Sequence, residues 1–241
     1  MSASVTDGDE LADLDPFDLM DAEAARIDAH LSRLDPGGWL EPSRCRGWRV
    51  REVVAHLAAS EEYNHATLDG SVAELMARFQ AREVTSLDAI NDLGVRERAD
   101  RTPVALLDEW RPAAAETRRR LRERGREGML DTSVGPYPAG RQGFHLASEL
   151  AIHADDIGVP VAAEERRQRP AWRARVARSI VREYDRPVRI EASAGMNRVV
   201  GTDGAVEAEI DDETLVEACA ARLPEDHPLD RRLREDLRVL A

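Results

Sequence analysis

The stretch Glu149-Leu150-Ala151-Ile152-His153-Ala154-Asp155-Asp156-Ile157 combines the apolar spacing of a buried helix with side chains that bind metal ions. Glu149 and His153 stand four positions apart, so a helix places them on one face with roughly 5–6 Å between their β-carbons. His153 falls inside the apolar stripe and Glu149 lies beside it, so both side chains should point into the protein. Because an unpaired charge is costly there, we expect these two residues to have a partner.

A second histidine, His56, lies much earlier in the chain, within Val54-Ala55-His56-Leu57 at the edge of another helical apolar stripe. Together with Glu149 and His153 it makes a set of two histidines and one carboxylate, which suits a divalent metal ion. Two other interpretations stay open. Glu149 and His153 could form a buried ion pair without a metal, and His145, one turn before Glu149, could replace His56 as a ligand. The remaining histidines, His30, His65 and His227, are expected at the surface.

Four long stretches with helical apolar spacing predict a four-helix bundle in the N-terminal part of the chain. They run over about 16–34, 50–68, 102–121 and 141–157. Thr102 and Pro103 are a typical N-cap and first-turn pair, and Gly70 and Gly158 are typical helix ends. Between these stretches, residues 71–100 predict one or two shorter helices and residues 133–140 a loop, while residues 1–14 are expected to be a loose acidic leader.

The apolar spacing changes from helical to alternating near residue 186, which predicts a second, smaller domain. Val188, Ile190 and Ala192 alternate with polar residues, and a similar alternation around 206–210 completes the pattern of three short strands. A helix near 170–184 precedes them, and helices over about 212–222 and 229–240 should cover the sheet, because three strands alone bury too little apolar surface. We therefore predict a bundle over 10–160, a connecting helix over 161–185 and a small α/β domain over 186–241.

The composition argues against several classes of partner. The 241 residues carry a formal net charge of −13, which disfavours nucleic acid and anionic membranes because both attract basic surfaces. No stretch reaches the ~20 apolar residues of a membrane span, and the N-terminus lacks the basic start and apolar centre of a signal peptide. We therefore expect a cytoplasmic protein with small-molecule partners. Cys45 and Cys219 lie far apart, so neither a structural disulfide nor a cysteine-rich metal site is expected.

Two segments resemble one known family. Cys45-Arg46-Gly47-Trp48-Arg49-Val50-Arg51-Glu52-Val53-Val54-Ala55-His56-Leu57, followed by the stretch from Glu149 to Asp156, is similar in order and spacing to the mycothiol-dependent maleylpyruvate isomerases. The resemblance implies a mainly α protein, in which a DinB-like four-helix bundle is followed by a small α/β domain. It also implies that His56, Glu149 and His153 hold a divalent metal, usually zinc, and that mycothiol is the thiol cosubstrate.

The resemblance is weaker in the C-terminal part. Members of this family often carry a Gly-Arg pair after a helix, which is thought to place an arginine over the carboxylates of the substrate. This chain has Ala221-Arg222 instead, so the arginine matches and the glycine does not. The resemblance thus implies a catalytic role for Arg222.

Three protein ligands leave one coordination position open, as catalytic metal sites do. A thiol in that position is deprotonated near neutral pH, because the metal stabilises the thiolate. The thiolate could add to the double bond of an unsaturated diacid and leave after rotation, which is a cis–trans isomerisation, or stay as an S-conjugate. The alternatives are a hydrolase that activates water with the same ligands and a bundle that keeps its metal for binding or regulation without turnover. Zinc is the default, but nickel, iron and manganese suit the same residues.

Two further residues, Asp156 and Cys45, belong to the segments that carry the predicted ligands. Asp156 either orients the ring of His153, as metal-bound histidines usually require, or is an ordinary carboxylate at a helix end. Cys45 is interpreted as a small packing residue, because nothing near it in the sequence indicates a general base.

Overall fold

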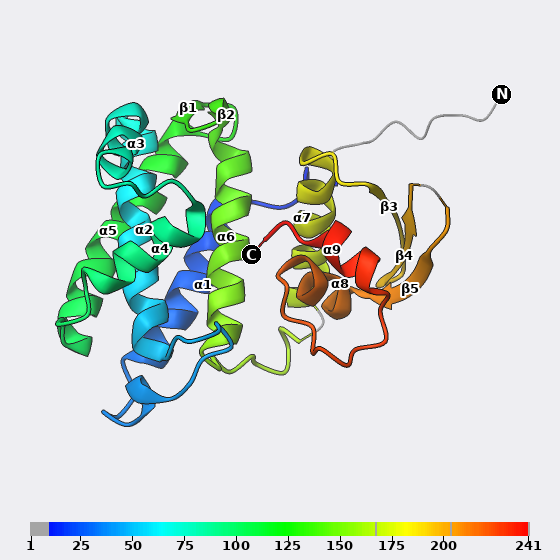
Figure 1. Cartoon of the computed structure of the whole chain (residues 1–241), viewed down its shortest axis with the longest axis horizontal. Coiled ribbons are helices and arrows are strands. Elements are labelled where there is room, and N and C mark those ends of the chain that lie inside the picture. The colour runs from blue at the N-terminus through cyan, green and yellow to red at the C-terminus, as the bar shows by residue number, and fades with distance from the viewer. Residues whose placement is uncertain (1–9, 167, 203, 241) are drawn as a thin grey trace. The chain divides into compact units, whose positions relative to one another are not determined.

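A computed structural model of the chain describes residues 10–166, 168–202 and 204–240. These residues form two compact units, one over 16–160 and the other over 161–240 together with the segment 10–15. The first is a helical bundle and the second combines helices with a small sheet, so the predicted fold class is confirmed (Figure 1). The predicted domain bounds at residues 160 and 185 stay a prediction. Among the helices of the described ranges, none is both long and apolar enough to cross a membrane.

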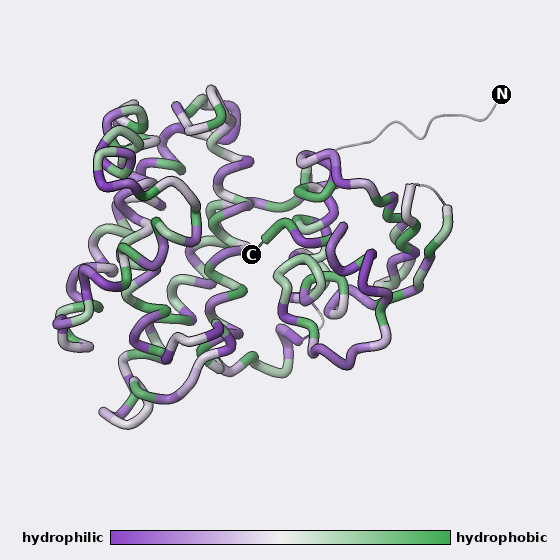
Figure 2. Tube along the Cα trace, viewed as in Figure 1, coloured by the Kyte–Doolittle hydropathy of each residue, from purple (hydrophilic) through white to green (hydrophobic). Residues whose placement is uncertain are grey.

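The first unit is built on four long helices, which lie side by side (Figure 1). They are α1 (Pro16–Leu31), α2 (Val50–Asp69), α5 (Pro103–Arg124) and α6 (Ala139–Asp156). Helix α1 packs on α6, and α2 packs on α5. Hydrophobic and hydrophilic residues alternate along each helix (Figure 2), and the apolar sides meet in a core that includes Ile27, Val53, Leu106 and Ala154. This arrangement fixes the side chains of α2 and α6 that point into the bundle.

The ends of these helices follow the signals in the sequence. Thr102 Oγ1 accepts a hydrogen bond from the N–H of Ala105 at 3.2 Å, which satisfies one of the donors that a helix start leaves unpaired. Gly70 ends α2 with φ at 69°, a left-handed conformation that glycine adopts without a steric penalty. Two shorter helices, α3 (Val72–Gln80) and α4 (Leu87–Arg96), follow α2 as predicted, and a 3-10 helix, η1 (Gly38–Leu40), follows α1.

The prediction of a loop over 133–140 is wrong. Strands β1 (Met129–Thr132) and β2 (Gly135–Pro138) form an antiparallel hairpin there, and α6 begins directly after it. Thr132 Oγ1 donates a hydrogen bond to the carbonyl oxygen of Gly135 at 2.6 Å and so closes the turn. Strands of four residues, with prolines at two positions of β2, are too short to show an alternating pattern in the sequence.

The second unit contains a three-stranded antiparallel sheet in the order β3 (Val188–Ser193), β4 (Met196–Gly201) and β5 (Glu207–Asp211). Ala194 and Gly195 join the first two strands with φ at 49° and 81°, as in the two-residue turns that suit the twist of a hairpin. Helix α7 (Gln168–Glu183) packs on α8 (Asp212–Cys219), while α8 and α9 (Arg231–Leu237) contact the sheet. The three strands predicted from the sequence are confirmed.

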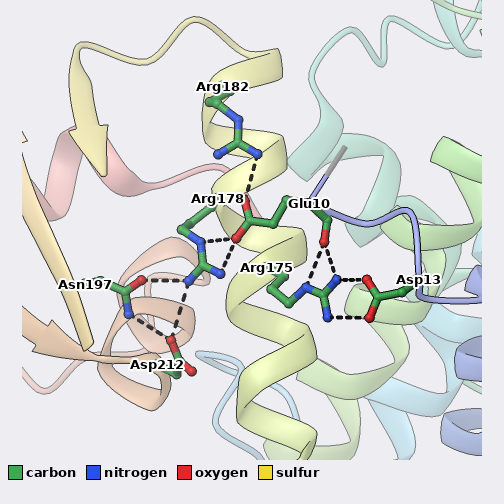
Figure 3. A network of polar contacts seen from close by, with 7 residues as sticks. All are labelled: Glu10, Asp13, Arg175, Arg178, Arg182, Asn197 and Asp212. Carbon is green, nitrogen blue, oxygen red and sulfur yellow. Dashed lines mark hydrogen bonds and ion pairs between the residues drawn. The ribbon is translucent and has the colours of Figure 1, made fainter. Parts of the chain in front are cut away.

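The expectation of a loose leader over 1–14 is wrong for residues 10–14, and residues 1–9 lie outside the described part of the chain. Leu11 is 1% exposed, and the arginines of α7 bind the acidic residues beside it. Arg178 forms an ion pair with Glu10, and Arg175 forms one with Asp13. Figure 3 shows the polar contacts among Glu10, Asp13, Arg175, Arg178, Arg182, Asn197 and Asp212.

Candidate metal centre

Helices α2 and α6 bring the three predicted ligands together inside the bundle. The Nε2 atom of His56 lies 3.4 Å from Oε1 of Glu149, and the ring centroids of His56 and His153 are 4.9 Å apart with an interplanar angle of 70°. One possible ligand atom from each residue lies within 4.8 Å of the other two. The fold thus gathers three side chains that are far apart in the sequence. That they bind a metal ion stays a prediction.

The two histidines are buried, whereas the carboxylate remains accessible. His56 and His153 are 5% and 8% exposed, while the side chain of Glu149 is 38% exposed. The Nδ1 atom of His56 is buried and has no hydrogen-bond partner among the described residues, although most buried polar atoms have one. Because Glu149 is the exposed member of the three, solvent reaches the group from the side of its carboxylate.

The protonation of the three residues follows from their surroundings. Burial lowers the pKa of His56, and the contact with Glu149 opposes this only in part. Burial also lowers the pKa of His153, but hydrogen bonds with Asp156 and Cys45 and the charge of Glu149 outweigh it and raise the pKa to about 9. Burial raises the pKa of Glu149, but the two histidines lower it more strongly. At neutral pH the metal-free site thus holds one protonated histidine, His153, which must lose its proton before a metal ion binds.

Asp156 lies directly behind His153. Its Oδ2 atom is 3.1 Å from Nδ1 of His153, and its side chain is completely buried. Because an ionised carboxylate only accepts hydrogen bonds, Nδ1 carries the proton and Nε2 is the nitrogen left for a metal ion. This contact matches the first of the two interpretations of Asp156, namely that it orients the ring of His153.

The interpretation of Cys45 as a packing residue is incomplete. Its Sγ atom lies 3.1 Å from Oδ2 of Asp156 and 3.9 Å from Nδ1 of His153. Cys45, His153 and Asp156 are therefore a second group of possible metal ligands, which shares His153 with the first. A single loop cysteine gives no such signal in a sequence, because metal sites are recognised by the spacing of several ligands.

The other candidate histidines do not join either group. His145, the alternative third ligand, has its Nε2 atom 3.0 Å from Oη of Tyr137. His65, expected at the surface, is partly buried, and its Nε2 atom lies 3.1 Å from the carbonyl oxygen of Ala113. Among the described residues, only His56 and His153 contribute histidine nitrogens to a possible ligand group.

The bundle also contains a buried acid, Glu61, that the sequence analysis missed. Glu61 is 9% exposed, and its Oε2 atom accepts hydrogen bonds from Thr117 at 2.6 Å and from Asn64 at 3.1 Å. Burial raises the pKa of Glu61, and these two hydrogen bonds counter the rise only in part. The residues next to Glu61 in α2 are polar, so the sequence did not indicate that its side chain is buried. The burial arises because α5 packs over it.

Arg222 belongs to the second unit, after α8. Its Nη1 atom donates a hydrogen bond to the carbonyl oxygen of Ala220 at 3.1 Å. Ala221 has φ at 54°, a left-handed conformation that costs a residue with a β-carbon roughly 1–2 kcal/mol. This backbone suits the resemblance, in which a glycine stands at the position of Ala221. The catalytic role of Arg222 stays a prediction.

The comparisons with known proteins agree with this architecture. Residues 20–158 match the family model described as the mycothiol maleylpyruvate isomerase N-terminal domain. The crystal structure of a mycothiol-dependent maleylpyruvate isomerase has the same fold, with a TM-score of 0.52 and 19% identity over 69% of this chain and 68% of that chain. A histidine-to-alanine mutant of such an isomerase matches with a TM-score of 0.51 and 21% identity over the same shares of both chains.

No curated protein matches the chain. The match to the family model nevertheless spans more than half of the chain and includes both helices that carry the candidate ligands. The chain therefore belongs to the family of the mycothiol maleylpyruvate isomerase N-terminal domain.

Proposed function

We propose that this protein is a metal-dependent enzyme that activates a low-molecular-weight thiol, mycothiol, for reaction with an unsaturated diacid of the maleylpyruvate type. The observation that carries this proposal is the convergence of His56, Glu149 and His153 at a place that solvent reaches, within the segment that matches the family. Asp156 supports it, because metal-bound histidines usually donate their second nitrogen to a carboxylate or a carbonyl group.

The residues fit a divalent metal ion. The 3.4 Å between His56 Nε2 and Glu149 Oε1 exceeds the length of a good hydrogen bond, so this contact by itself pairs the two groups poorly. Two imidazole nitrogens and one carboxylate oxygen are a ligand set of catalytic zinc sites, and they leave a position for a small molecule. A metal ion held by these residues would lower the pKa of a thiol bound to it, so that the thiolate would be present near neutral pH.

The reaction uses the thiolate of mycothiol as a nucleophile. Its sulfur adds to one alkene carbon of the diacid, and the electron pair of the double bond moves onto the conjugated carbonyl group as an enolate. The former double bond is then a single bond and rotates. Return of the electron pair expels the thiolate and leaves the trans diacid, whereas protonation of the enolate carbon leaves an S-conjugate. The resemblance assigns Arg222 to a substrate carboxylate, a role that suits a guanidinium because it pairs with a carboxylate through two parallel hydrogen bonds.

The ligand set is tested by replacing His153 with alanine. We expect His153→Ala to abolish metal retention and to leave the helical circular dichroism largely intact, because α6 keeps its apolar contacts. His145→Ala is the matched control on the same helix, since His145 contacts Tyr137 and should leave metal content unchanged. Full metal occupancy in His153→Ala, or its loss in His145→Ala alone, would overturn the proposed ligands.

The thiol chemistry is tested with cobalt in place of the native metal. Mycothiol should produce a thiolate-to-cobalt charge-transfer band that an alcohol analogue does not produce, and catalytic mycothiol should then convert the cis diacid to the trans diacid. The spectrum before thiol addition must be subtracted, because Cys45 offers a sulfur of its own close to His153. A bound metal that does not respond to thiol, without turnover, would favour a bundle that keeps its metal for binding or regulation.

A further inference from the structure

The strongest unexplained feature of the bundle is the thiol behind His153. Cys45 is 8% exposed, and its Sγ atom donates to Oδ2 of Asp156 at 3.1 Å, the same oxygen that lies 3.1 Å from Nδ1 of His153. One carboxylate oxygen thus joins a thiol from the loop before α2 to an imidazole of α6. These three side chains form a continuous chain of hydrogen bonds that ends at a candidate metal ligand.

The loop holds Cys45 in place through its own backbone. Ser43 Oγ accepts a hydrogen bond from the N–H of Cys45 at 3.1 Å and donates one to the carbonyl oxygen of Trp48 at 2.8 Å. The N–H of Arg44 donates to the carbonyl oxygen of Asp156 at 3.0 Å. The loop is therefore fastened both to itself and to the end of α6, so the position of the thiol relative to Asp156 is well defined.

The buried carboxylate of Asp156 is stabilised by hydrogen-bond donors around it. A carboxylate that is completely buried loses its hydration, and it is stable only where hydrogen bonds replace the lost water. Oδ2 receives one bond from His153 and one from Cys45. The second donor holds the carboxylate in the orientation in which it also meets Nδ1 of His153, which leaves Nε2 of that ring for a metal ion.

We propose that Cys45 is a positioning residue of the metal centre, whose thiol fixes Asp156 so that Asp156 fixes His153. This inference rests on the proposed function, in which His153 is a metal ligand. Cys45 could instead bind the metal directly, but His153 cannot offer Nδ1 to a metal ion while it donates that N–H to Asp156. The hydrogen-bond chain therefore favours the positioning role.

The test compares Cys45→Ala with Cys45→Ser in the full-length protein. The two variants have similar side-chain volumes, but only serine keeps a donor for Asp156. We expect Cys45→Ala to weaken Zn²⁺ binding about tenfold in competition with a chelator, in the range seen when partners of metal ligands are removed, and to alter the visible spectrum of the Co²⁺ protein. Cys45→Ser should bind Zn²⁺ almost as tightly as the wild type and restore the spectrum. In an Asp156→Ala background, Cys45→Ala should cause no further loss, because the chain is already broken.

Three results would overturn the inference. Unchanged Zn²⁺ affinity in Cys45→Ala, with a wild type that binds metal and thiol, would refute the role of Cys45 and leave the proposed function intact. A thiolate-to-cobalt band in the thiol-free wild type that disappears in both variants, with equal losses of affinity, would make Cys45 a ligand. A wild type that binds no metal would refute the proposed function and this inference together. If Asp156→Ala does not fold, the comparison of Cys45→Ala with Cys45→Ser still tests whether Cys45 positions Asp156.

Discussion

At the scale of single residues, the protonation of His153 couples the stability of the metal-free protein to pH. Its pKa is about 9 in the fold and starts from 6.5 in the absence of the fold, so the folded state holds an extra proton between these values. We expect a stabilisation of up to about 3 kcal/mol that is complete below pH 6.5 and is lost as the pH rises through 9. The pKa of His56 is lowered in the fold, so its own contribution falls mainly on the acidic side of this window, where the unfolded chain still protonates it.

Urea unfolding in the presence of a chelator, repeated across pH 6.5 to 9, measures this effect. His153→Gln should remove the pH dependence, whereas His30→Gln in the last turn of α1 should keep it. A wild-type free energy of unfolding that stays constant above pH 6.5 would contradict the assignment. The same proton makes metal binding tighter as the pH rises, because a metal ion must displace it.

Replacement of the buried Glu61 by glutamine should stabilise the protein. The pKa of Glu61 is raised by burial, so the folded state resists its ionisation, and stability falls as the pH rises above 4.5, the ordinary pKa of a glutamate. We expect Glu61→Gln to raise the free energy of unfolding at neutral pH by about 1 kcal/mol or more, since the amide oxygen still accepts from Thr117 and Asn64. Glu62→Gln, on the exposed side of the same helix, should change it by less than about 0.5 kcal/mol. Chemical denaturation at neutral pH separates the two, and a destabilised Glu61→Gln would refute this account.

At the scale of elements, α4 packs on α2 through a glycine. A β-carbon at Gly94 would lie only 2.5 Å from the β-carbon of Ala59. Alanine normally stabilises the interior of a helix by about 1 kcal/mol relative to glycine, but overpacking costs about 1–3 kcal/mol. We expect Gly94→Ala to lower the free energy of unfolding by about 1 kcal/mol, measured by chemical denaturation.

A second substitution separates the effect of helix propensity from the effect of the clash with Ala59. Adding Ala59→Gly removes the clash, so the double variant should show a favourable coupling energy in a double-mutant cycle. If Gly94→Ala instead stabilised the protein, helix propensity would outweigh the contact between α2 and α4.

Local patterns predicted the elements unevenly. The long helices and the strands of the C-terminal sheet repeat their apolar spacing often enough to be recognised, and Thr102 and Gly70 mark helix ends through interactions within one turn. The hairpin over 129–138 has too few residues for a period, and its prolines are untypical of strands. It contacts α2 through residues far away in the sequence, for example between Ser133 Oγ and Tyr63 Oη at 3.1 Å.

At the scale of the whole molecule, the second unit draws residues from both ends of the described chain. Glu10 pairs with Arg178 and lies 2.9 Å from Nη2 of Arg182. Arg178 is 7% exposed, so the loss of Glu10 would leave a buried charge with less compensation. We expect Glu10→Ala to destabilise this unit by about 1–3 kcal/mol, which is less than for a fully buried pair because Asp212 remains 3.5 Å from Arg178.

Hydrogen exchange shows which of the two units Glu10→Ala destabilises. Amides of α7 and of the sheet should exchange faster in Glu10→Ala, while those of α2 and α6 keep their protection. Asp18→Ala is a suitable control, because Asp18 pairs with Arg122 on an exposed surface of the bundle and contributes little to stability. Equal acceleration in both units would contradict the assignment of residues 10–15 to the second unit.

The sequence by itself determined the long helices, the strands of the C-terminal sheet and the placing of Glu149 and His153 on one helix face, because apolar periods and the spacing of four residues are properties of short segments. His56 joined this pair only through the resemblance, and metal binding by the three residues stays a prediction. Only the tertiary structure decided that Cys45 meets Asp156, that Glu61 is buried under α5 and that Glu10 is bound by α7. These contacts join residues that are distant in the chain, and they depend on the paths of loops and on the packing of helices. No local pattern specifies either of these, because the energy that decides them comes from surfaces that meet only in the folded protein.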